Sequence, residues 1–213
     1  MKKKLILIGA GGHCKVIIDS LKDHSEFEIE GIIDCPEKIG QSVLGIPIVG
    51  SDDDLERIYN QGVQYAFIAI GSIRYPNKRI EIFNLLLRIG YQIPNIIDST
   101  AIIAKSVKMG KGNYFGKGAI VNADVNIKDA CIINTGSIIE HDGYIDNFVH
   151  IAPRATLCGN VSVGEKTHIG CSATVIQDIR IGKECIIGAG SVVIRNIPEK
   201  VQVCGVPAKI KQN

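Results

Sequence analysis

Apolar residues recur at every sixth position through the C-terminal half of the chain. From Ile97 to Val193 each of these positions holds Ile, Leu, Val, Met or Phe, without a slip or an insertion. The residue four places further on, from Ala101 to Ile197, is mostly small, and strand alternation points both residues the same way. Helical periodicity cannot hold a fixed phase at six residues, whereas a stacked solenoid can. The pattern therefore predicts a prism of short parallel strands, three strands to a coil, rather than a sandwich with irregular spacing.

The residue before each large apolar one should face outward, and three hexads return the chain to the same side of the prism. Two of the three sides then carry mostly apolar or aromatic residues on the outside. One carries Ile102, Ile120, Ile138, Thr156, Thr174 and Val192, and the other carries Tyr114, Ile132, His150, His168 and Ile186. Because exposed apolar stripes mark interfaces and these two sides differ, the sequence predicts a closed ring of three chains, a homotrimer.

The N-terminal part of the chain follows another rule. Short apolar runs alternate with helical patterns, the runs at Leu5–Ile8, Ile29–Ile33 and Tyr65–Ile70 and the helices at His13–Leu21, Asp52–Asn60 and Arg79–Arg88. Such alternation is typical of a small parallel α/β sheet. The expected organisation is an α/β Rossmann-like domain over residues 1–94, followed by an all-β parallel β-helix over residues 95–213.

A glycine-rich turn, Gly9-Ala-Gly11-Gly12-His13, joins the first strand to the first helix. Backbone N–H groups and a helix N-terminus meet at such a turn, which suits a phosphate. Asp34, after the second strand, could accept a hydrogen bond from a ribose hydroxyl, and His13 could donate to a phosphate or a uracil carbonyl. A turn that needs glycine for its geometry alone and a nicotinamide site are the alternatives, but Cys14 interrupts the dinucleotide fingerprint. A nucleotide or nucleotide-sugar phosphate fits best.

Ionisable side chains are scarce in the hexads, except at Glu140-His141-Asp142. Asp142 can orient the imidazole of His141 and raise its basicity, which is the pairing that a general base needs near neutral pH. An exposed histidine without a function is the alternative. His150 and His168 fall one coil apart on the same side and could bind a metal, but no third ligand is evident, so no metal is expected.

Composition excludes several classes of function. The formal net charge of +2 argues against a partner bound through charge alone, so neither nucleic acid nor an anionic membrane is expected. The apolar runs are too short to span a bilayer, and the N-terminus does not resemble a signal peptide. Seven cysteines without a C-x-x-C pair indicate reduced thiols in a cytoplasmic protein.

The glycine-rich turn, the uninterrupted hexads, the Glu140-His141-Asp142 triplet and the closing Gly205-Val-Pro-Ala-Lys209 together resemble the hexapeptide-repeat acyltransferases. Most similar are the two-domain N-acetyltransferases that act on nucleotide-linked 4-amino-4-deoxy sugars, and sialic acid O-acetyltransferases share the layout. The resemblance implies a left-handed β-helix, a homotrimer and acetyl-CoA as co-substrate, bound between subunits. The expected function is acetyl-CoA-dependent N-acetylation of a nucleotide-linked amino sugar. Sugar O-acetylation and a metal-dependent, carbonic-anhydrase-like hydratase are the alternatives, and the histidine spacing does not suit the hydratase.

The same resemblance implies roles for individual residues. His141 would be the catalytic base and Asp142 its partner. Positions that match the coenzyme groove are His150, Gly159, Cys171, Gly188 and Ala189, and positions that match the nucleotide-sugar pocket are Gly11, Gly12, His13, Asp34 and Gly71. The segment from Ser72 to Arg79 departs from the family pattern, which leaves the sugar and the nucleotide open. Because His141 and His150 are half a coil apart, they can share an active site only if two subunits build it.

Overall fold

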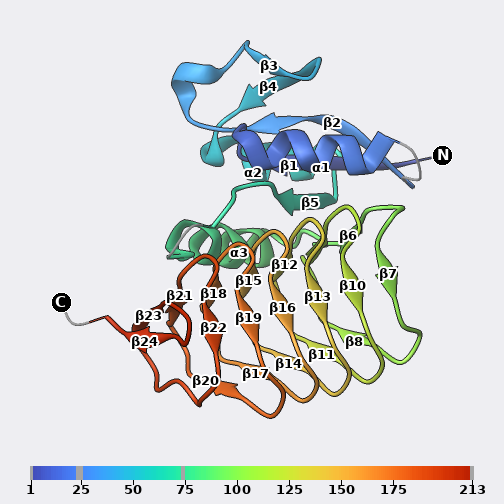
Figure 1. Cartoon of the computed structure of the whole chain (residues 1–213). Coiled ribbons are helices and arrows are strands. Elements are labelled where there is room, and N and C mark those ends of the chain that lie inside the picture. Colours follow the sequence, from blue (N-terminus) through green and yellow to red (C-terminus); the bar gives the residue numbers. More distant parts are fainter. Residues whose placement is uncertain (1, 23–25, 73–74, 212–213) are drawn as a thin grey trace. The chain divides into compact units, whose positions relative to one another are not determined.

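The computed structural model describes residues 2–22, 26–72 and 75–211. The chain divides into two compact units, Met1–Gly71 with Asn77–Ile96 and Ser72–Pro76 with Ile97–Asn213 (Figure 1). Two residues of the segment that departs from the family pattern, 73 and 74, lie outside the described residues.

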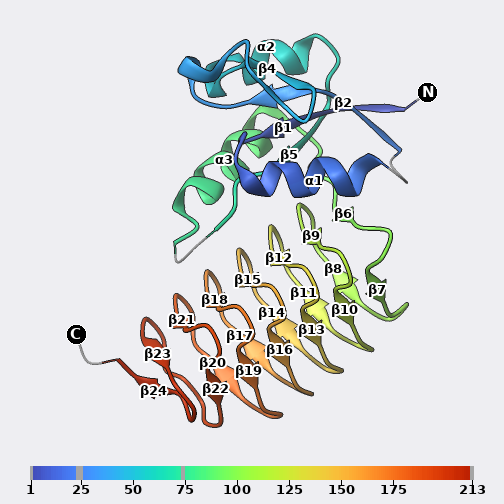
Figure 2. The ribbon, with the colours of Figure 1, turned by 45° about the horizontal axis from the view of Figure 1, so that its top comes forward.

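The N-terminal unit is a five-stranded sheet in the order β3-β4-β2-β1-β5, accompanied by helices (Figure 2). Its elements are β1 (Lys3–Ile8), α1 (Gly12–Lys22), β2 (Phe27–Ile33), the 3-10 turn η1 (Pro36–Lys38), β3 (Ser42–Val43), β4 (Ile46–Gly50), the 3-10 turn η2 (Asp52–Asp54), α2 (Leu55–Asn60), β5 (Tyr65–Ile68) and α3 (Asn77–Ile89). Strand β1 pairs in parallel with β2 and β5, β2 pairs in parallel with β4, and β3 forms a hairpin with β4. The predicted α/β class is confirmed.

Burial explains why these segments form these elements. The last four residues of β1 are fully buried, as expected for a parallel strand with both faces covered. Helix α1 buries one apolar face, which includes Ile17, Ile18 and Leu21. The chain turns from β1 to α1 at Gly9, where φ is +103° and a β-carbon would lie 2.5 Å from Cγ1 of Ile70. Only glycine fits this close approach of two strand ends.

The C-terminal unit is a coil of very short strands that stack into three parallel sheets. Its strands are β6 (Ile96–Ile97), β7 (Ile102–Ile103), β8 (Lys108–Met109), β9 (Tyr114–Phe115), β10 (Ile120–Val121), β11 (Asn126–Ile127), β12 (Ile132–Ile133), β13 (Ile138–Ile139), β14 (Tyr144–Ile145), β15 (His150–Ile151), β16 (Thr156–Leu157), β17 (Ser162–Val163), β18 (His168–Ile169), β19 (Thr174–Val175), β20 (Arg180–Ile181), β21 (Ile186–Ile187), β22 (Val192–Val193), β23 (Gln202–Cys204) and β24 (Lys209–Ile210). The sheets run β7 to β22, β8 to β20 and β6 to β24, and the strands from β7 to β22 pair in parallel with the strands of neighbouring coils. The third sheet ends differently, in the antiparallel pair β23–β24. The coil is a left-handed β-helix, as the resemblance implied.

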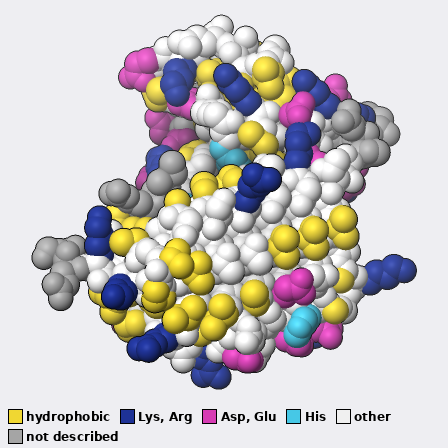
Figure 3. Space-filling model, viewed as in Figure 1, with side chains coloured by type: hydrophobic (Ala, Val, Ile, Leu, Met, Phe, Trp, Pro, Cys, Tyr) yellow, Lys and Arg dark blue, Asp and Glu magenta, His cyan; other side chains and the backbone are white. Residues whose placement is uncertain are grey.

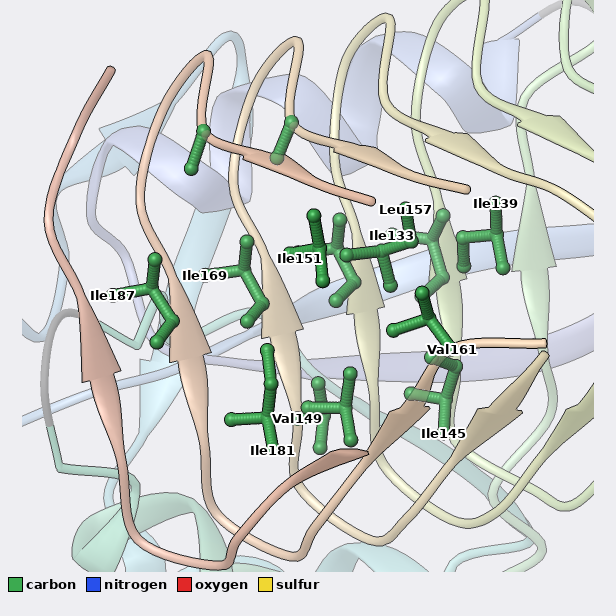
Figure 4. Close-up of a cluster of buried hydrophobic side chains, with 14 of the residues drawn as sticks. Ile133, Ile139, Ile145, Val149, Ile151, Leu157, Val161, Ile169, Ile181 and Ile187 are labelled. Atoms are coloured by element: carbon green, nitrogen blue, oxygen red, sulfur yellow. The ribbon is translucent and has the colours of Figure 1, made fainter. Parts of the chain in front are cut away.

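The predicted inward residues form the core of this coil (Figure 4). Ile133, Ile139, Ile145 and Ile151 are each 0 % exposed, and Cys131 and the other small residues fill the space between them. Burying one such side chain stabilises the fold by about 1.5–3 kcal/mol relative to leaving it exposed. The hexad pattern thus reports the core correctly from Phe115 to Val193, whereas at the start of the coil Ile97 is 44 % exposed and Ile103 and Met109 are only partly buried.

Each coil turns at corners where a residue adopts the left-handed conformation. Along one corner these residues are Asp124, Asp142, Asn160 and Asp178, with φ between 56° and 63°. Asp and Asn tolerate this conformation better than other residues with a side chain, because their short polar groups bond locally. The corner therefore has a backbone reason for Asp142 apart from any chemistry.

The outward positions of the sheets differ in exposure. Ile102, at the start of the sheet that runs from β7 to β22, is 64 % exposed, and hydrophobic side chains lie over the surface of the coil in Figure 3. In contrast, Tyr114, Ile132 and His150 are 0 %, 1 % and 7 % exposed. The second apolar stripe, expected to be exposed, is therefore largely buried within the chain. A sequence pattern indicates which side chains face out of the coil, but it does not indicate what covers them. No helix among the described residues combines the length and the apolar character needed to cross a membrane.

Candidate active site

His141 lies on the corner between β13 and β14, where its side chain is 62 % exposed. Its Nδ1 atom lies 2.8 Å from Oδ2 of Asp142, which is equally exposed. A carboxylate can only accept a hydrogen bond, so in the neutral ring Nδ1 carries the proton and donates it to Asp142. The lone pair then lies on Nε2. The geometry leaves Nε2 as the basic atom of a histidine held on a rigid corner.

The surroundings of His141 make its ring more basic. The hydrogen bond to Asp142 raises the pKa of His141 above the ordinary histidine value. The loss of hydration opposes this effect, and the negative charges of Asp142, Glu140 and Asp178 add to it. Figure 3 shows a histidine of the coil among acidic side chains. A base of this kind gains a proton more readily than a free imidazole does.

The side chain of His150 is held quite differently: it projects from the outward side of β15 but is buried. The Oδ1 atom of Asn134 accepts a hydrogen bond from the backbone N–H of Thr135 at 2.8 Å, so the amide nitrogen of Asn134 faces Nε2 of His150 at 3.1 Å. Because an amide N–H donates, Nε2 of His150 must accept. Its Nδ1 then carries the proton and donates to the backbone carbonyl of Ser72. Both ring nitrogens therefore have protein partners, and contact with a thioester would require His150 to give up one of them.

His150 and His168 stack edge to face with ring centroids 4.8 Å apart, as their spacing of one coil predicted. Burial lowers the pKa of His168. Within the part of the chain that the structure describes, no group of three His, Cys, Asp or Glu side chains could hold a metal ion.

The other positions matched to the coenzyme groove fall on two corners of the prism. Gly159 follows β16 and lies on the same corner as His141, one coil further on. Cys171, Gly188 and Ala189 follow β18 and β21 and lie on another corner, where the N–H of Gly190 donates to the carbonyl of Cys171 at 2.8 Å. The coil therefore presents two separate groups of candidate residues, with the sheet from β7 to β22 between them.

In the N-terminal unit, Gly12 is the first residue of α1 and Gly11 directly precedes it. Both are exposed, and a β-carbon placed on either would meet nothing within 4 Å. Helix α1 has no acidic residue in its first turn. The N-terminus of an eleven-residue helix thus carries partial positive charge next to accessible backbone N–H groups, as a phosphate site requires.

Asp34 is bound to the turn that precedes α1. Its carboxylate accepts hydrogen bonds from the backbone N–H of Ala10 at 2.5 Å and of Cys35 at 2.7 Å, and from the ammonium of Lys38 at 3.0 Å. Burial alone would raise the pKa of Asp34, but the bonds from Cys35, Lys38 and Ala10 outweigh it and lower the pKa to about 2. Asp34 therefore holds the glycine-rich turn in place, and a ribose would have to share an already occupied carboxylate.

His13 stands beside this turn in a neutral form. Burial, and after it the charge of Arg79, lowers the pKa of His13 to about 4. Arg79 is 2 % exposed and donates to the backbone carbonyls of Ile68, the last residue of β5, and of Ile70, two residues beyond it. Arg79 was not among the site residues predicted from the sequence. A basic residue in the first turn of a helix, where the dipole disfavours it, was the available signal.

Two family models match parts of this chain, and solved structures match nearly all of it. Residues 4–86 match the family of the PglD N-terminal domain, and residues 160–195 match the bacterial transferase hexapeptide family. The chain is 36 % identical to a perosamine N-acetyltransferase from Caulobacter crescentus, solved as a histidine-to-asparagine variant with CoA and GDP-perosamine, with a TM-score of 0.91 over 99 % of this chain and 97 % of that one. It is 32 % identical to the acetyltransferase domain of PglB from Neisseria gonorrhoeae in complex with acetyl coenzyme A, with a TM-score of 0.89 over 99 % and 100 % of the two chains.

One further relative has no known activity. The uncharacterized protein L142 of Acanthamoeba polyphaga mimivirus is 34 % identical over 127 residues, which are 60 % of this chain, and the match spans only 24 % of that protein. The two family matches and the full-length structural likeness agree with each other and with the fold. The chain therefore belongs to the hexapeptide-repeat acyltransferases, in the group whose β-helix follows a PglD-type N-terminal domain.

Proposed function

We propose that this chain transfers an acetyl group from acetyl-CoA to the amine of a nucleotide-linked 4-amino-4-deoxy sugar, with His141 as the general base. The observation that carries the proposal is the exposed His141–Asp142 pair on a rigid corner of the β-helix. The likeness to an N-acetyltransferase bound to CoA and GDP-perosamine supports the class of substrate.

The chemistry follows from the tautomer of His141. The amine attacks the thioester through its nitrogen lone pair, and the nitrogen must lose a proton for the amide to form. Nε2 of His141 would accept that proton during or after the attack. The new C–N bond forms at the carbonyl carbon, the C–S bond breaks, and the coenzyme leaves as a thiol after taking up the proton that His141 had accepted. Asp142 would hold the ring in the required tautomer and stabilise the imidazolium that forms. The transfer needs no covalent enzyme intermediate.

The N-terminal unit would position the sugar. Exposed backbone N–H groups at Gly11 and Gly12, at the start of α1, suit the diphosphate of a nucleotide sugar. Holding the diphosphate orients the amine, and orientation of this kind supplies a large part of enzymatic acceleration. His13, which stays neutral at physiological pH, can donate a hydrogen bond to the nucleobase or a phosphate, or accept one from the nucleobase, but it adds no charge.

A direct assay tests the proposal. Purified protein is incubated with acetyl-CoA and each of a panel of UDP-, GDP- and dTDP-linked 4-amino sugars, and thiol release is followed together with the mass of the sugar product. We expect one of these sugars to gain a single acetyl group on its amine. Acetylation of sialic acid, included as a hydroxyl acceptor, without acetylation of any amino sugar would replace the proposal with sugar O-acetyltransfer.

Removing the base gives the first mutational prediction. His141→Ala should lower kcat by about 10²–10⁴-fold, the usual loss for a general base, and leave the affinity for acetyl-CoA nearly intact. Steady-state kinetics with calorimetric binding of CoA measure both effects. An unchanged kcat would show that the base lies elsewhere or that the amine arrives already deprotonated.

A further inference from the structure

Gly159 is an exception on its corner of the β-helix. The equivalent positions on the other coils are Lys105, Ala123, His141, Gln177 and Arg195, all of them exposed, whereas Gly159 is buried. Its φ lies outside the left-handed region, so its backbone is one that any residue adopts. Neither the coil nor its corner therefore requires glycine here.

The imidazole of His141 explains the exception. A β-carbon on Gly159 would lie 2.6 Å from Cε1 and 2.7 Å from Nε2 of His141. Carbon atoms in contact prefer about 3.5–4.0 Å, so even a methyl group would displace the ring by about 1 Å. The two coils cannot separate to make room, because the N–H of Asn160 donates to the carbonyl of His141 at 2.8 Å. The exposed ring is the part that would move.

We infer that Gly159 is a positioning residue for His141: its missing side chain leaves the recess in which the imidazole lies while Nδ1 bonds to Asp142. The resemblance placed Gly159 in the coenzyme groove, whereas the recess at Gly159 serves the imidazole of His141. The inference rests on the proposed function only where catalysis is measured. Displacing the ring breaks its bond with Asp142 and moves Nε2, which together weaken the base and misplace it.

The test is Gly159→Ala, read first from the pKa of His141. Protein labelled with ¹³C-histidine is titrated by NMR, and the His141 signal is assigned from its absence in His141→Ala. We expect the pKa of His141 to fall toward the ordinary histidine value in Gly159→Ala, because its bond to Asp142 is lost. In Asp142→Asn, which already lacks that carboxylate, Gly159→Ala should cause no further fall. The control Gln177→Ala, one coil further on the same corner, should leave the pKa unchanged.

Kinetics supply the second reading. A displacement of about 1 Å should lower kcat by about 10²-fold, with KM for acetyl-CoA changed by less than about twofold. An unchanged pKa of His141 in Gly159→Ala overturns the inference, and a raised KM for acetyl-CoA with that unchanged pKa would assign Gly159 to the coenzyme instead. If the unmodified protein acetylates no sugar, the proposed function fails while the NMR titration still decides the inference.

Folding of the variant is checked by thermal unfolding. If Gly159→Ala fails to fold, the double variant His141→Ala/Gly159→Ala decides the matter. The inference expects the double variant to fold, because removing the imidazole makes room for the new β-carbon. Failure of both variants to fold would show that Gly159 serves the coil itself and would overturn the inference.

Discussion

Asp142 serves two purposes at one position. Its φ of 61° favours Asp or Asn on backbone grounds, and its carboxylate bonds to Nδ1 of His141. An Asn at this position keeps the left-handed backbone and removes the charge, so Asp142→Asn separates the two purposes. Asp124, one coil earlier with a φ of 60°, offers the matched control, because the residue before it is Ala123 rather than a histidine.

The prediction for Asp142→Asn concerns pH. The base works only when His141 is neutral, and the bond to Asp142 raises the pKa of His141, so activity of the unmodified protein should fall as pH drops through that raised value. In Asp142→Asn the pKa falls, and the acidic limb of kcat/KM should move to lower pH while the plateau also drops. Asp124→Asn should leave the limb in place. If the acidic limb does not move in Asp142→Asn, the titration of His141 is not what produces it.

His13 gives a prediction about stability. Its pKa is about 4 in the folded chain because of burial and the charge of Arg79, against about 6.5 when unfolded. Between these values the unfolded chain binds a proton that the folded chain does not, so the free energy of unfolding should decrease as pH falls from about 6.5 to about 4. His13→Gln should remove this part of the decrease in thermal unfolding across that range, and His141→Gln should retain it. Equal slopes in both variants would contradict a buried, neutral His13.

At the level of elements, the hexads predicted the coil well because each strand contributes one large inward side chain, so the pattern repeats with every strand. Hairpin β3–β4 was not predicted. Its first strand has only two residues, and its turn depends on Leu44 and Gly45 at positive φ rather than on periodicity. Short elements of this kind are decided by pairing with neighbours, here β2, which a sequence pattern does not contain.

Separation along the chain decides which contacts of the site could be predicted. His141 and Asp142 are adjacent in sequence, so their pairing could be foreseen. The partners of His150 could not be foreseen, because Asn134 and Ser72 lie 16 and 78 residues away in the chain. The recess at Gly159 depends on a ring from the previous coil, and neighbouring coils are close only after folding.

Truncating an inward-facing side chain should lower the free energy of unfolding far more than truncating an outward-facing one. Ile151 is 0 % exposed within the core of the coil, so Ile151→Ala should lower the free energy of unfolding by about 2–5 kcal/mol. Ser162→Ala, at an outward position of β17, should change it by less than about 0.5 kcal/mol. Urea unfolding at fixed protein concentration measures both. Similar losses would mean that the core does not stabilise the coil in the way that its burial implies.

At the scale of the whole molecule, one chain does not bring its candidate residues into a single site within the coil. His141 and Gly159 lie on the corner after the sheet from β7 to β22, whereas His150 lies on the sheet from β6 to β24 and Cys171 on the corner after it. An assembly in which one chain's first corner faces the neighbour's second corner would unite them. The exposed Ile102 stripe is the apolar surface available for such an assembly.

We therefore predict a homotrimer whose active sites lie between subunits, and a mixing experiment tests it. His141→Ala and His150→Trp, each expected to be inactive alone, are unfolded and refolded together. Random assembly pairs an intact His141 with an intact neighbouring His150 face at about a quarter of the interfaces, so activity should return to about a quarter of that of the unmodified trimer. Light scattering should give three times the mass of one chain before and after mixing. Mixed trimers that form without activity would show that each chain builds its site alone, and a monomeric mass at micromolar concentration would remove the trimer itself.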